Sequence, residues 1–590
     1  MTLLGTFQQA GAFEPIDVQL GRLLARRAED SVPSSRSDLI ALAAARLSAE
    51  RRRGHACIGL DDLAELPVAD DEPRDSFARL TGVPLPSAAE WAAALRGAGA
   101  LCGSGADATP LVLDGERLYL YRYWAAERRL AGKLRALLGQ PVATPTPAVE
   151  ALHARLFPDD PGTVDWQSKA VRMAVARRFG VITGGPGTGK TTTVARILAL
   201  LLTDSPHCRI ALAAPTGKAA ARLKDAIEGE LRRLALPSGL HGRIPTRGQT
   251  LHRLLGYRPW EDRFGRNAER PLTEDVIVVD EASMVDLLLM DALFDAVRPD
   301  ARVILLGDHG QLASVETGAV LGDLCRLADA GAKPLDASVV RLRRSWRFEK
   351  QPGIGALAAA LHEGDPVAAV ASLGDARLDE IALHPWPAAG ASALAPVEAE
   401  VDAYLAAGSP AEALDRLGAF RILCATYGGD RGVDAMTALV EDRLRRSGRE
   451  VDTMHYDRQP VLVTANDYAT ELFNGDVGVV FERDGVKLVY FADGKGGVRH
   501  VAPARLPAHR SAWAMTVHKA QGSEFGRVLL VLPEGDSRVL TRELLYTGVT
   551  RARERVDILG RPETIAAACA RTTRRRSGFA EALGFEAPGG

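Results

Sequence analysis

Cysteine is scarce in this chain, and its few copies are scattered. The six positions are Cys57, Cys102, Cys208, Cys325, Cys424 and Cys569. No CxxC pair occurs among them, so the spacing signals neither a zinc site nor a disulfide framework. Unpaired cysteines fit a reducing compartment, and we therefore expect a cytoplasmic protein.

Long apolar runs are also missing. No stretch of about 18 consecutive apolar residues occurs, so the sequence predicts no membrane-spanning helix and no membrane partner. The opening segment MTLLGTFQQAGAFEP has no basic region followed by a long apolar one, so it does not resemble a secretory signal.

A basic excess is absent too, because the formal net charge is −2 and the isoelectric point is about 6.7. This balance argues against a protein that coats or packages nucleic acid. It leaves room for a motor, whose positive charge need only line one groove. The local basic clusters Arg51–Arg53, Arg443/Arg445/Arg446 and Arg574–Arg576 are interpreted as solvated helix faces.

What the chain does have is length and an ordinary globular composition. Its 590 residues, 46% hydrophobic and 25% charged, predict several domains. Residues 1–145 are expected to form a mostly helical domain with no catalytic constellation, followed by a linker at Thr144–Pro147. We expect two α/β domains at 146–334, with a small insertion at about 224–249, and at 335–590. The stretch 351–420 is Ala-rich and uninformative.

Short apolar runs alternate with helical segments in both α/β regions. In the first they are Val181–Thr183, Arg209–Ala214, Val276–Val279 and Val303–Leu306, and in the second Arg421–Ala425 and Val528–Leu532. Continuous apolar runs suit strands buried on both faces of a parallel sheet, so the pattern predicts the doubly wound α/β class. Between the two strands of the second region, residues 475–510 are predicted to form the short strands of a small inserted β-barrel.

A phosphate-binding loop follows the first of these strands. The segment Gly184-Gly185-Pro186-Gly187-Thr188-Gly189-Lys190-Thr191, followed by Thr192, fits GxxxxGK[ST] and opens a helix. The glycines let backbone N–H groups close on phosphate oxygens, and the helix N-terminus favours the anion. Lys190 is expected to neutralise the β- and γ-phosphates of ATP, and the Thr191 hydroxyl to hold Mg²⁺.

Acidic and amide side chains follow two further strands. Asp280 and Glu281 end the Val276–Val279 strand; we expect Asp280 to hold Mg²⁺ and Glu281 to take a proton from the attacking water. Gln311 follows the Gly307-Asp308 strand end and can place its amide near the γ-phosphate. These features alone indicate a P-loop ATPase.

The order of the remaining motifs resembles superfamily 1 helicases over about residues 165–555. Ser345-Trp346-Arg347-Phe348, the segment Ala514–Phe525 and Tyr546–Arg553 carry this resemblance. It implies that Gln167 reads adenine and that Arg347 and Arg551 reach the γ-phosphate as arginine fingers.

The same resemblance implies contacts with the nucleic-acid strand. The residues concerned are Thr216, Lys218, His252, Thr516 and His518. Such grooves bind the phosphate backbone and stack bases with little sequence preference. A structural role for any one of these side chains stays open.

Within superfamily 1 the chain resembles the RecD family. Pro460–Asp467 and Phe473–Gly478 carry that likeness and imply an SH3-like insertion at about 460–512. The resemblance also implies 5′→3′ translocation on single-stranded DNA, action at duplex ends in double-strand break repair and recombination, and RecB and RecC as partners in exodeoxyribonuclease V. There the nuclease belongs to RecB, and no nuclease constellation is visible here.

Two alternatives remain open. Stand-alone RecD-like helicases usually carry proline where Ala313 stands, and have a longer N-terminal region with helix-hairpin-helix repeats that is not seen before residue 165. Residues 1–145 instead resemble the portion that docks onto RecC. The other alternative is a nucleic-acid-gated ATPase switch without net unwinding, against which the two arginine fingers count.

Overall fold

The computed structural model describes most of the chain. The ranges are 3–9, 12–28, 34–63, 86–141, 143–158, 164–234, 248–387, 392–467, 469–493, 497–535 and 537–585. Part of the insertion expected at about 224–249 lies outside these residues.

The N-terminal region is mainly helical, as expected, but it also holds a small sheet. Its helices are α1 (Leu3–Gln9), α2 (Pro15–Ala28), α3 (Ser34–Arg52), α4 (Leu60–Leu63), α6 (Ala88–Arg96) and α7 (Tyr121–Leu138). The sheet has the order β1-β4-β3-β2, from β1 (Cys57–Gly59), β2 (Cys102–Gly103), β3 (Leu111–Asp114) and β4 (Arg117–Leu120). Strands this short carry too little alternation to be recognised in a sequence.

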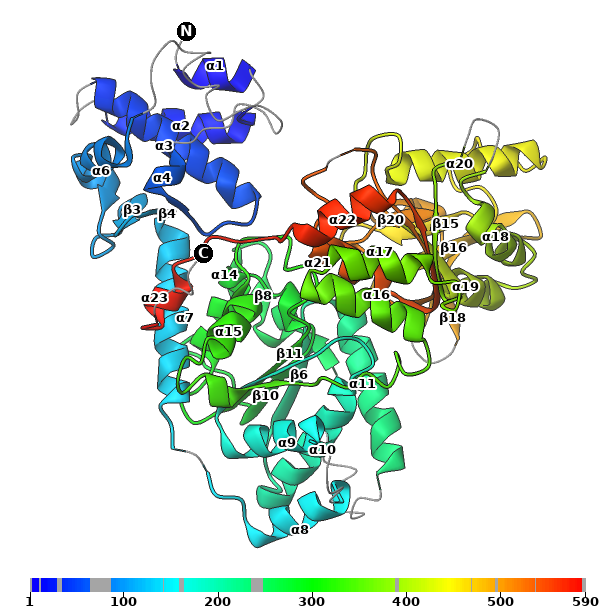
Figure 1. The fold of residues 1–590 in the computed structure, drawn as a ribbon, viewed down its shortest axis with the longest axis horizontal. Coiled ribbons are helices and arrows are strands. Elements are labelled where there is room, and N and C mark those ends of the chain that lie inside the picture. Colours follow the sequence, from blue (N-terminus) through cyan, green and yellow to red (C-terminus); the bar gives the residue numbers. More distant parts are fainter. Residues whose placement is uncertain are drawn as a thin grey trace.

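The first lobe is a six-stranded parallel sheet with helices on both faces (Figure 1). Its order is β12-β5-β11-β10-β6-β7, with β5 (Phe179–Thr183), β6 (Ile210–Ala214), β7 (Gly248–Thr250), β10 (Val276–Val279), β11 (Arg302–Gly307) and β12 (Val339–Arg341). All four residues of β10 are buried, because alternate side chains enter two cores.

The two cores of the first lobe use different helices. Ile277 and Val279 face α7, α14 (Leu287–Ala296) and α15 (Val320–Asp329). Val276 and Val278 face α8 (Pro147–Leu156), α9 (Trp166–Ala176), α10 (Lys190–Asp204) and α11 (Gly217–Arg233). This arrangement confirms the doubly wound class and puts the carboxyl ends of the strands, where the motifs lie, along one edge.

The second lobe repeats the design with a five-stranded parallel sheet. Its order is β13-β22-β21-β14-β20, with β13 (Ile381–His384), β14 (Phe420–Cys424), β20 (Ala514–Thr516), β21 (Phe525–Val531) and β22 (Ala552–Leu559). One face packs on α16 (Pro352–Glu363), α17 (Pro366–Gly374), α21 (Arg542–Val549) and α22 (Pro562–Ala570), and the other on α18 (Glu398–Leu405), α19 (Pro410–Ala419) and α20 (Val433–Arg446). The stretch 351–420, uninformative in sequence, therefore supplies helices to both faces.

An antiparallel sheet is inserted between α20 and β20. Its order is β18-β17-β16-β15-β19, from β15 (Pro460–Val463), β16 (Val477–Arg483), β17 (Val486–Ala492), β18 (Val498–Val501) and β19 (His509–Ser511). These strands confirm the predicted β-rich insertion. Its SH3-like closure and the domain boundaries stay predictions.

The chain finally returns to the first lobe. Residues 571–578 leave the second lobe, and α23 (Phe579–Ala582) packs against α7 and α15 (Figure 1). Phe579, Ala582 and Leu583 are buried in the same core as α7. None of the helices in the described ranges combines the length and apolar composition needed to cross a membrane.

Candidate functional site

A hollow of about 760 Å³ lies where the two lobes meet. It is lined from the first lobe by Pro186–Thr192, Ala219, Arg222, Asp280, Glu281 and Gln311, and from the second lobe by Glu524, Arg551 and Arg553. Trp346 and Arg347 line it from a segment held against the P-loop, where the Trp346 N–H donates to the Gly187 carbonyl at 3.0 Å. The predicted catalytic side chains, scattered over the sequence, thus converge on one cavity.

The P-loop has the backbone geometry that its glycines require. Gly187 and Gly189 adopt positive φ angles of 74° and 81°, which residues other than glycine rarely adopt. The ammonium of Lys190 donates to the carbonyls of Gly184 and Gly185, at 2.6 and 3.1 Å. The lysine therefore lies folded over the loop that is expected to enclose the phosphates.

Gln167 lies directly against the same loop. Its Nε2 donates to the Thr188 carbonyl at 3.2 Å, and its Oε1 accepts from Arg196 at 3.2 Å. A Cβ at Gly189 would stand 2.3 Å from Nε2, so glycine is needed for this approach. The position fits adenine recognition, which stays a prediction.

The acidic pair stands at the end of β10. Asp280 Oδ1 accepts the Glu281 N–H at 2.9 Å, and Glu281 has a φ of 51°. Burial and the charge of Glu281 raise the pKa of Asp280 to about 6, against the attraction of Lys190. Two carboxyl groups are thus held beside the P-loop at a cost that a cation would relieve.

Gln311 takes part in a hydrogen-bond network that joins the lobes. Its Nε2 donates to Asp308 at 3.0 Å, and the Tyr546 hydroxyl of α21 donates to the same carboxylate at 2.9 Å. The N–H of Leu312 donates to Thr547 Oγ1 at 2.9 Å, and Gln521 Nε2 donates to the Leu312 carbonyl at 2.8 Å. A shift of Gln311 toward a phosphate would therefore change the hydrogen bonds between this loop and the second lobe.

Arg347 is held by a carboxylate that serves three arginines. Its Nη2 donates to Glu524 Oε1 at 2.7 Å, while Arg222 and Arg553 both reach Oε2 at 3.0 Å. Burial alone would raise the pKa of Glu524, but the charges of Arg347 and Arg222 outweigh it and lower that pKa to about 2. Glu524 therefore stays ionised and holds Arg347 beside the hollow.

Arg551 is fixed by backbone carbonyls. It is 2% exposed; its Nε donates to the Thr547 carbonyl and its Nη1 to the Ser523 carbonyl, both at 3.1 Å. Burial lowers its pKa, and the charges of Glu281 and Glu524 oppose that effect. The guanidinium is oriented at the wall of the hollow without an ion-pair partner among the described residues.

The residues expected to contact a nucleic-acid strand divide between the lobes. In the first, Thr216 caps α11 by accepting the Ala219 N–H at 3.2 Å, and His252 packs edge-on against Tyr257. Lys218 Nζ donates across the lobe boundary to Ser523 Oγ at 2.8 Å.

In the second lobe the expected strand contacts are more enclosed. Thr516 is buried, and its hydroxyl accepts the Lys519 N–H at 3.3 Å, while burial lowers the pKa of His518. The side chain of Thr516 thus fixes a turn in this arrangement. Strand contact by these five residues stays a prediction.

Sequence reasoning assigned no role to Arg222, Glu524 and Arg553, which meet at the wall of the hollow. Arg222 lies four residues after Lys218, on the same side of α11, so helical spacing could have found it. Glu524 stands within a recognised motif, but its partners Arg222, Arg347 and Arg553 come from distant segments. No local signal links them.

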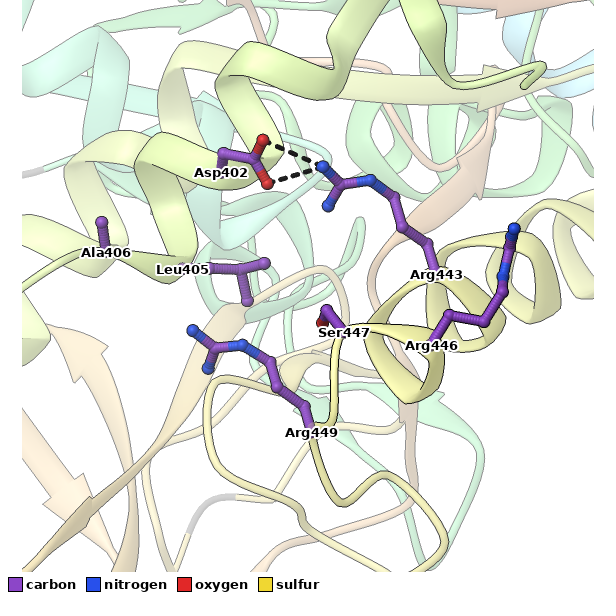
Figure 2. A pocket seen from close by; sticks show the side chains of 7 residues that line it. All are labelled: Asp402, Leu405, Ala406, Arg443, Arg446, Ser447 and Arg449. Atoms are coloured by element: carbon purple, nitrogen blue, oxygen red, sulfur yellow. Dashed lines mark hydrogen bonds and ion pairs between the residues drawn. The ribbon is translucent and has the colours of Figure 1, made fainter. Parts of the chain in front are cut away.

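A second hollow, of about 540 Å³, lies on the second lobe between α18 and the end of α20 (Figure 2). Arg443 pairs there with both oxygens of Asp402, and Arg446 and Arg449 also line the hollow. It holds none of the predicted motifs. Among the described residues, no three His, Cys, Asp or Glu side chains cluster as metal ligands anywhere.

Three family models match parts of the chain. They are the N-terminal domain of the RecBCD enzyme subunit RecD at residues 9–119, an AAA domain at 167–317 and a UvrD-like helicase C-terminal domain at 511–559. The matched segments cover most of the N-terminal region and parts of both lobes.

Curated relatives match over nearly the whole chain. The RecBCD enzyme subunit RecD of Mycobacterium tuberculosis is 39% identical over 98% of this chain and 96% of its own. That of Mycolicibacterium smegmatis is 39% identical over 99% of each chain. The ATP-dependent RecD2 DNA helicase of Deinococcus radiodurans is 34% identical over 78% of this chain, but this match covers only 58% of the relative.

Among solved structures, the Pif1 helicase from Candida albicans aligns with 68% of this chain and 96% of its own, at 16% identity and a TM-score of 0.39. The near-full-length matches at 39% identity show the family. The chain belongs to the family of RecD subunits of the RecBCD enzyme.

Proposed function

We propose that this chain hydrolyses ATP to move 5′→3′ along single-stranded DNA, as the RecD subunit of a RecBCD complex with RecB and RecC. The observation that carries the proposal is the convergence of the P-loop, the acidic pair and both arginines on one hollow between two lobes. The matched relatives are named as RecBCD subunits, which supports a role at DNA ends in double-strand break repair and recombination.

The geometry suggests a division of labour at the nucleotide. Lys190 would neutralise the β- and γ-phosphates, and Glu281 would accept a proton from the attacking water. Arg347 and Arg551 would stabilise charge on the transferred phosphoryl group. Arg551 belongs to the second lobe, whereas Arg347 lies on a segment that Ser345 and Trp346 tie to the P-loop of the first. Hydrolysis would therefore depend, through Arg551, on how the lobes are closed.

Mg²⁺ fits the residues present. The Thr191 hydroxyl and the Asp280 carboxylate line the same hollow, and the raised pKa of Asp280 marks a carboxylate short of positive charge. These two side chains would hold the ion, which supplies charge neutralisation of phosphate oxygens when bound.

Domain roles follow from the same proposal. Residues 1–145 would dock onto RecC, and the insertion at about 460–512 would be SH3-like. The two motor domains would be built on the two parallel sheets, and the first would extend past the boundary expected at 334 to include β12 (Val339–Arg341), which pairs with β5. Nuclease activity would arise only in the complex. The free state of all six cysteines supports a cytoplasmic setting.

The deciding experiment measures ATP turnover by the purified chain with and without single-stranded DNA, beside a Lys190→Gln variant. We expect strong stimulation by DNA that the variant loses, followed by unwinding of a duplex with a 5′ tail and not of one with a 3′ tail. If the isolated chain turns over no ATP, the same assay is run after reconstitution with RecB and RecC.

Two outcomes would replace the proposal. DNA-stimulated turnover without strand separation, alone or with RecB and RecC, would support a nucleic-acid-gated switch. Full unwinding by the isolated chain, with no binding to RecC, would support a stand-alone helicase.

A further inference from the structure

The segment that returns from the second lobe is tied to both lobes. At its start, Arg571 donates to the Ser537 carbonyl at 2.6 Å, and the Thr573 N–H donates to Glu543 at 3.0 Å. Further on, the Gly578 N–H donates to Glu127 of α7 at 3.1 Å. Residues 571–578, here called the strap, therefore bridge the second lobe and the core of the first.

Arg575, in the middle of the strap, holds one loop of the first lobe. Its Nη1 donates to the Gly318 carbonyl at 2.7 Å and to Ser314 Oγ at 3.2 Å. It also donates to the carbonyls of Glu316 and Ser314. One guanidinium thus satisfies three backbone carbonyls of residues 314–318.

The N-terminal region grips the same loop from its other side. The Gly318 N–H donates to the Gly54 carbonyl at 2.9 Å, and Thr317 Oγ1 donates to the Arg51 carbonyl at 3.4 Å. A Cβ at Gly54, whose φ is 92°, would stand 2.7 Å from the guanidinium carbon of Arg575. The end of α3, the loop and the strap therefore meet at this one side chain.

The loop begins next to the hollow between the lobes, which Gln311 lines. Gln311 and Leu312 stand three and two residues before Ser314. Leu312 is hydrogen-bonded across the lobes to Thr547 and Gln521. Gln311 donates to Asp308 of its own lobe, and that carboxylate also accepts from Tyr546 of the second lobe. Gln311 lies only three positions from Ser314, and a segment of that length has a short reach. Fixing the position of Ser314 therefore restricts the positions that the Gln311 amide can occupy.

We propose that Arg575 is a positioning residue for ATP hydrolysis. By fixing residues 314–318, Arg575 holds the Gln311 amide in a defined position relative to the second lobe. Its contact with Gly54 connects the N-terminal region to the same loop. This inference rests on the proposed function, because it assigns the loop a role in turnover. Arg575 itself touches no nucleotide.

The test compares Arg575→Ala with the matched control Arg574→Ala, which removes the neighbouring exposed arginine of the strap. We expect Arg575→Ala to lower DNA-stimulated kcat about tenfold with an unchanged KM for ATP. A tenfold loss corresponds to a rise of about 1.4 kcal/mol in the activation free energy. Arg574→Ala should behave as wild type, and Arg575→Lys, which keeps the charge but loses the fork, should recover part of kcat.

Hydrogen exchange of the amides at 311–318 gives a readout that does not need turnover. We expect faster exchange there in Arg575→Ala than in Arg574→Ala. Should the alanine variant fail to fold, Arg575→Lys is used for both measurements. Wild-type kcat in the folded variant would overturn the inference, even with faster exchange at 311–318, as would a rise in KM with kcat unchanged.

The two proposals fail differently. A wild-type chain without ATP turnover, even with RecB and RecC, would sink the proposed function, whatever the exchange at 311–318. A wild-type chain with normal DNA-stimulated turnover, matched by Arg575→Ala, would sink only the role of Arg575.

Discussion

Replacing Glu524 by glutamine tests the three-arginine cluster directly. The structure lowers the pKa of this carboxyl from 4.5 to about 2. At about 1.36 kcal/mol per pKa unit, the ionised form gains roughly 3 kcal/mol over the protonated form in the folded chain. Glu524 is only 15% exposed and Arg347 20%, so solvent screening removes little of this, while the 55% exposed Arg553 contributes least.

The sign of the pH dependence follows from the lowered pKa. The stabilisation is complete above the unfolded pKa, near 4.5, and is lost as the pH falls from there toward about 2. Glutamine has no such titration. We expect Glu524→Gln to unfold more easily than wild type by about 2–3 kcal/mol at neutral pH, with the difference narrowing below about pH 4.5.

Thermal and denaturant unfolding between neutral and acid pH measure this difference. The matched control is Glu554→Gln, which removes an exposed carboxylate of β22 that forms no ion pair with another described residue. Equal stability of Glu524→Gln and wild type at neutral pH would refute the reasoning. So would a loss that stays the same at all pH values, because packing and not charge would then be its cause.

Three further results are expected. Arg551→Lys should lower kcat about 1000-fold with little change in KM, because a lysine cannot reproduce the fixed fork; a mainly KM effect in steady-state kinetics would contradict this. Burial, together with the charge of Asp323, raises the pKa of Glu127 to about 7, so the stability of the wild type should fall as the pH rises from about 4.5 to 7. Glu127→Gln should flatten this pH dependence in thermal melts, and an unchanged pH dependence in the variant would contradict the assignment. Chelation of divalent cations by EDTA should abolish turnover and excess Mg²⁺ restore it; turnover that survives EDTA would exclude the assigned role of Asp280.

Much of the architecture was predictable because local sequence patterns, such as apolar runs and the P-loop motif, determine the strands and helices. The run Val276–Val279 predicts a doubly buried strand, and β10 has those bounds. The P-loop signature predicts a strand, a glycine loop and a helix in that order, as β5 and α10 confirm. The insertion was visible in the sequence as a series of short strands over 475–510.

Pairings between distant segments were not predictable, because nothing local encodes them. Glu524 meets Arg222 and Arg347 only after the two lobes are placed together. Arg575 belongs to a basic triplet interpreted as a solvated face, yet its guanidinium lies against backbone carbonyls of the first lobe. A charged side chain shows its partner only when long-range packing is known.

The packing of α23 has a consequence for how the chain is made. Phe579, Ala582 and Leu583 complete a core otherwise built from α7, α14, α15 and the first sheet. At about 5–20 residues per second, the ribosome needs tens of seconds between Asp329 and Phe579. The first lobe therefore waits for its last core residues while the whole second lobe is synthesised, and the seam between α7 and α15 is the place where a chaperone would find apolar surface on the nascent chain.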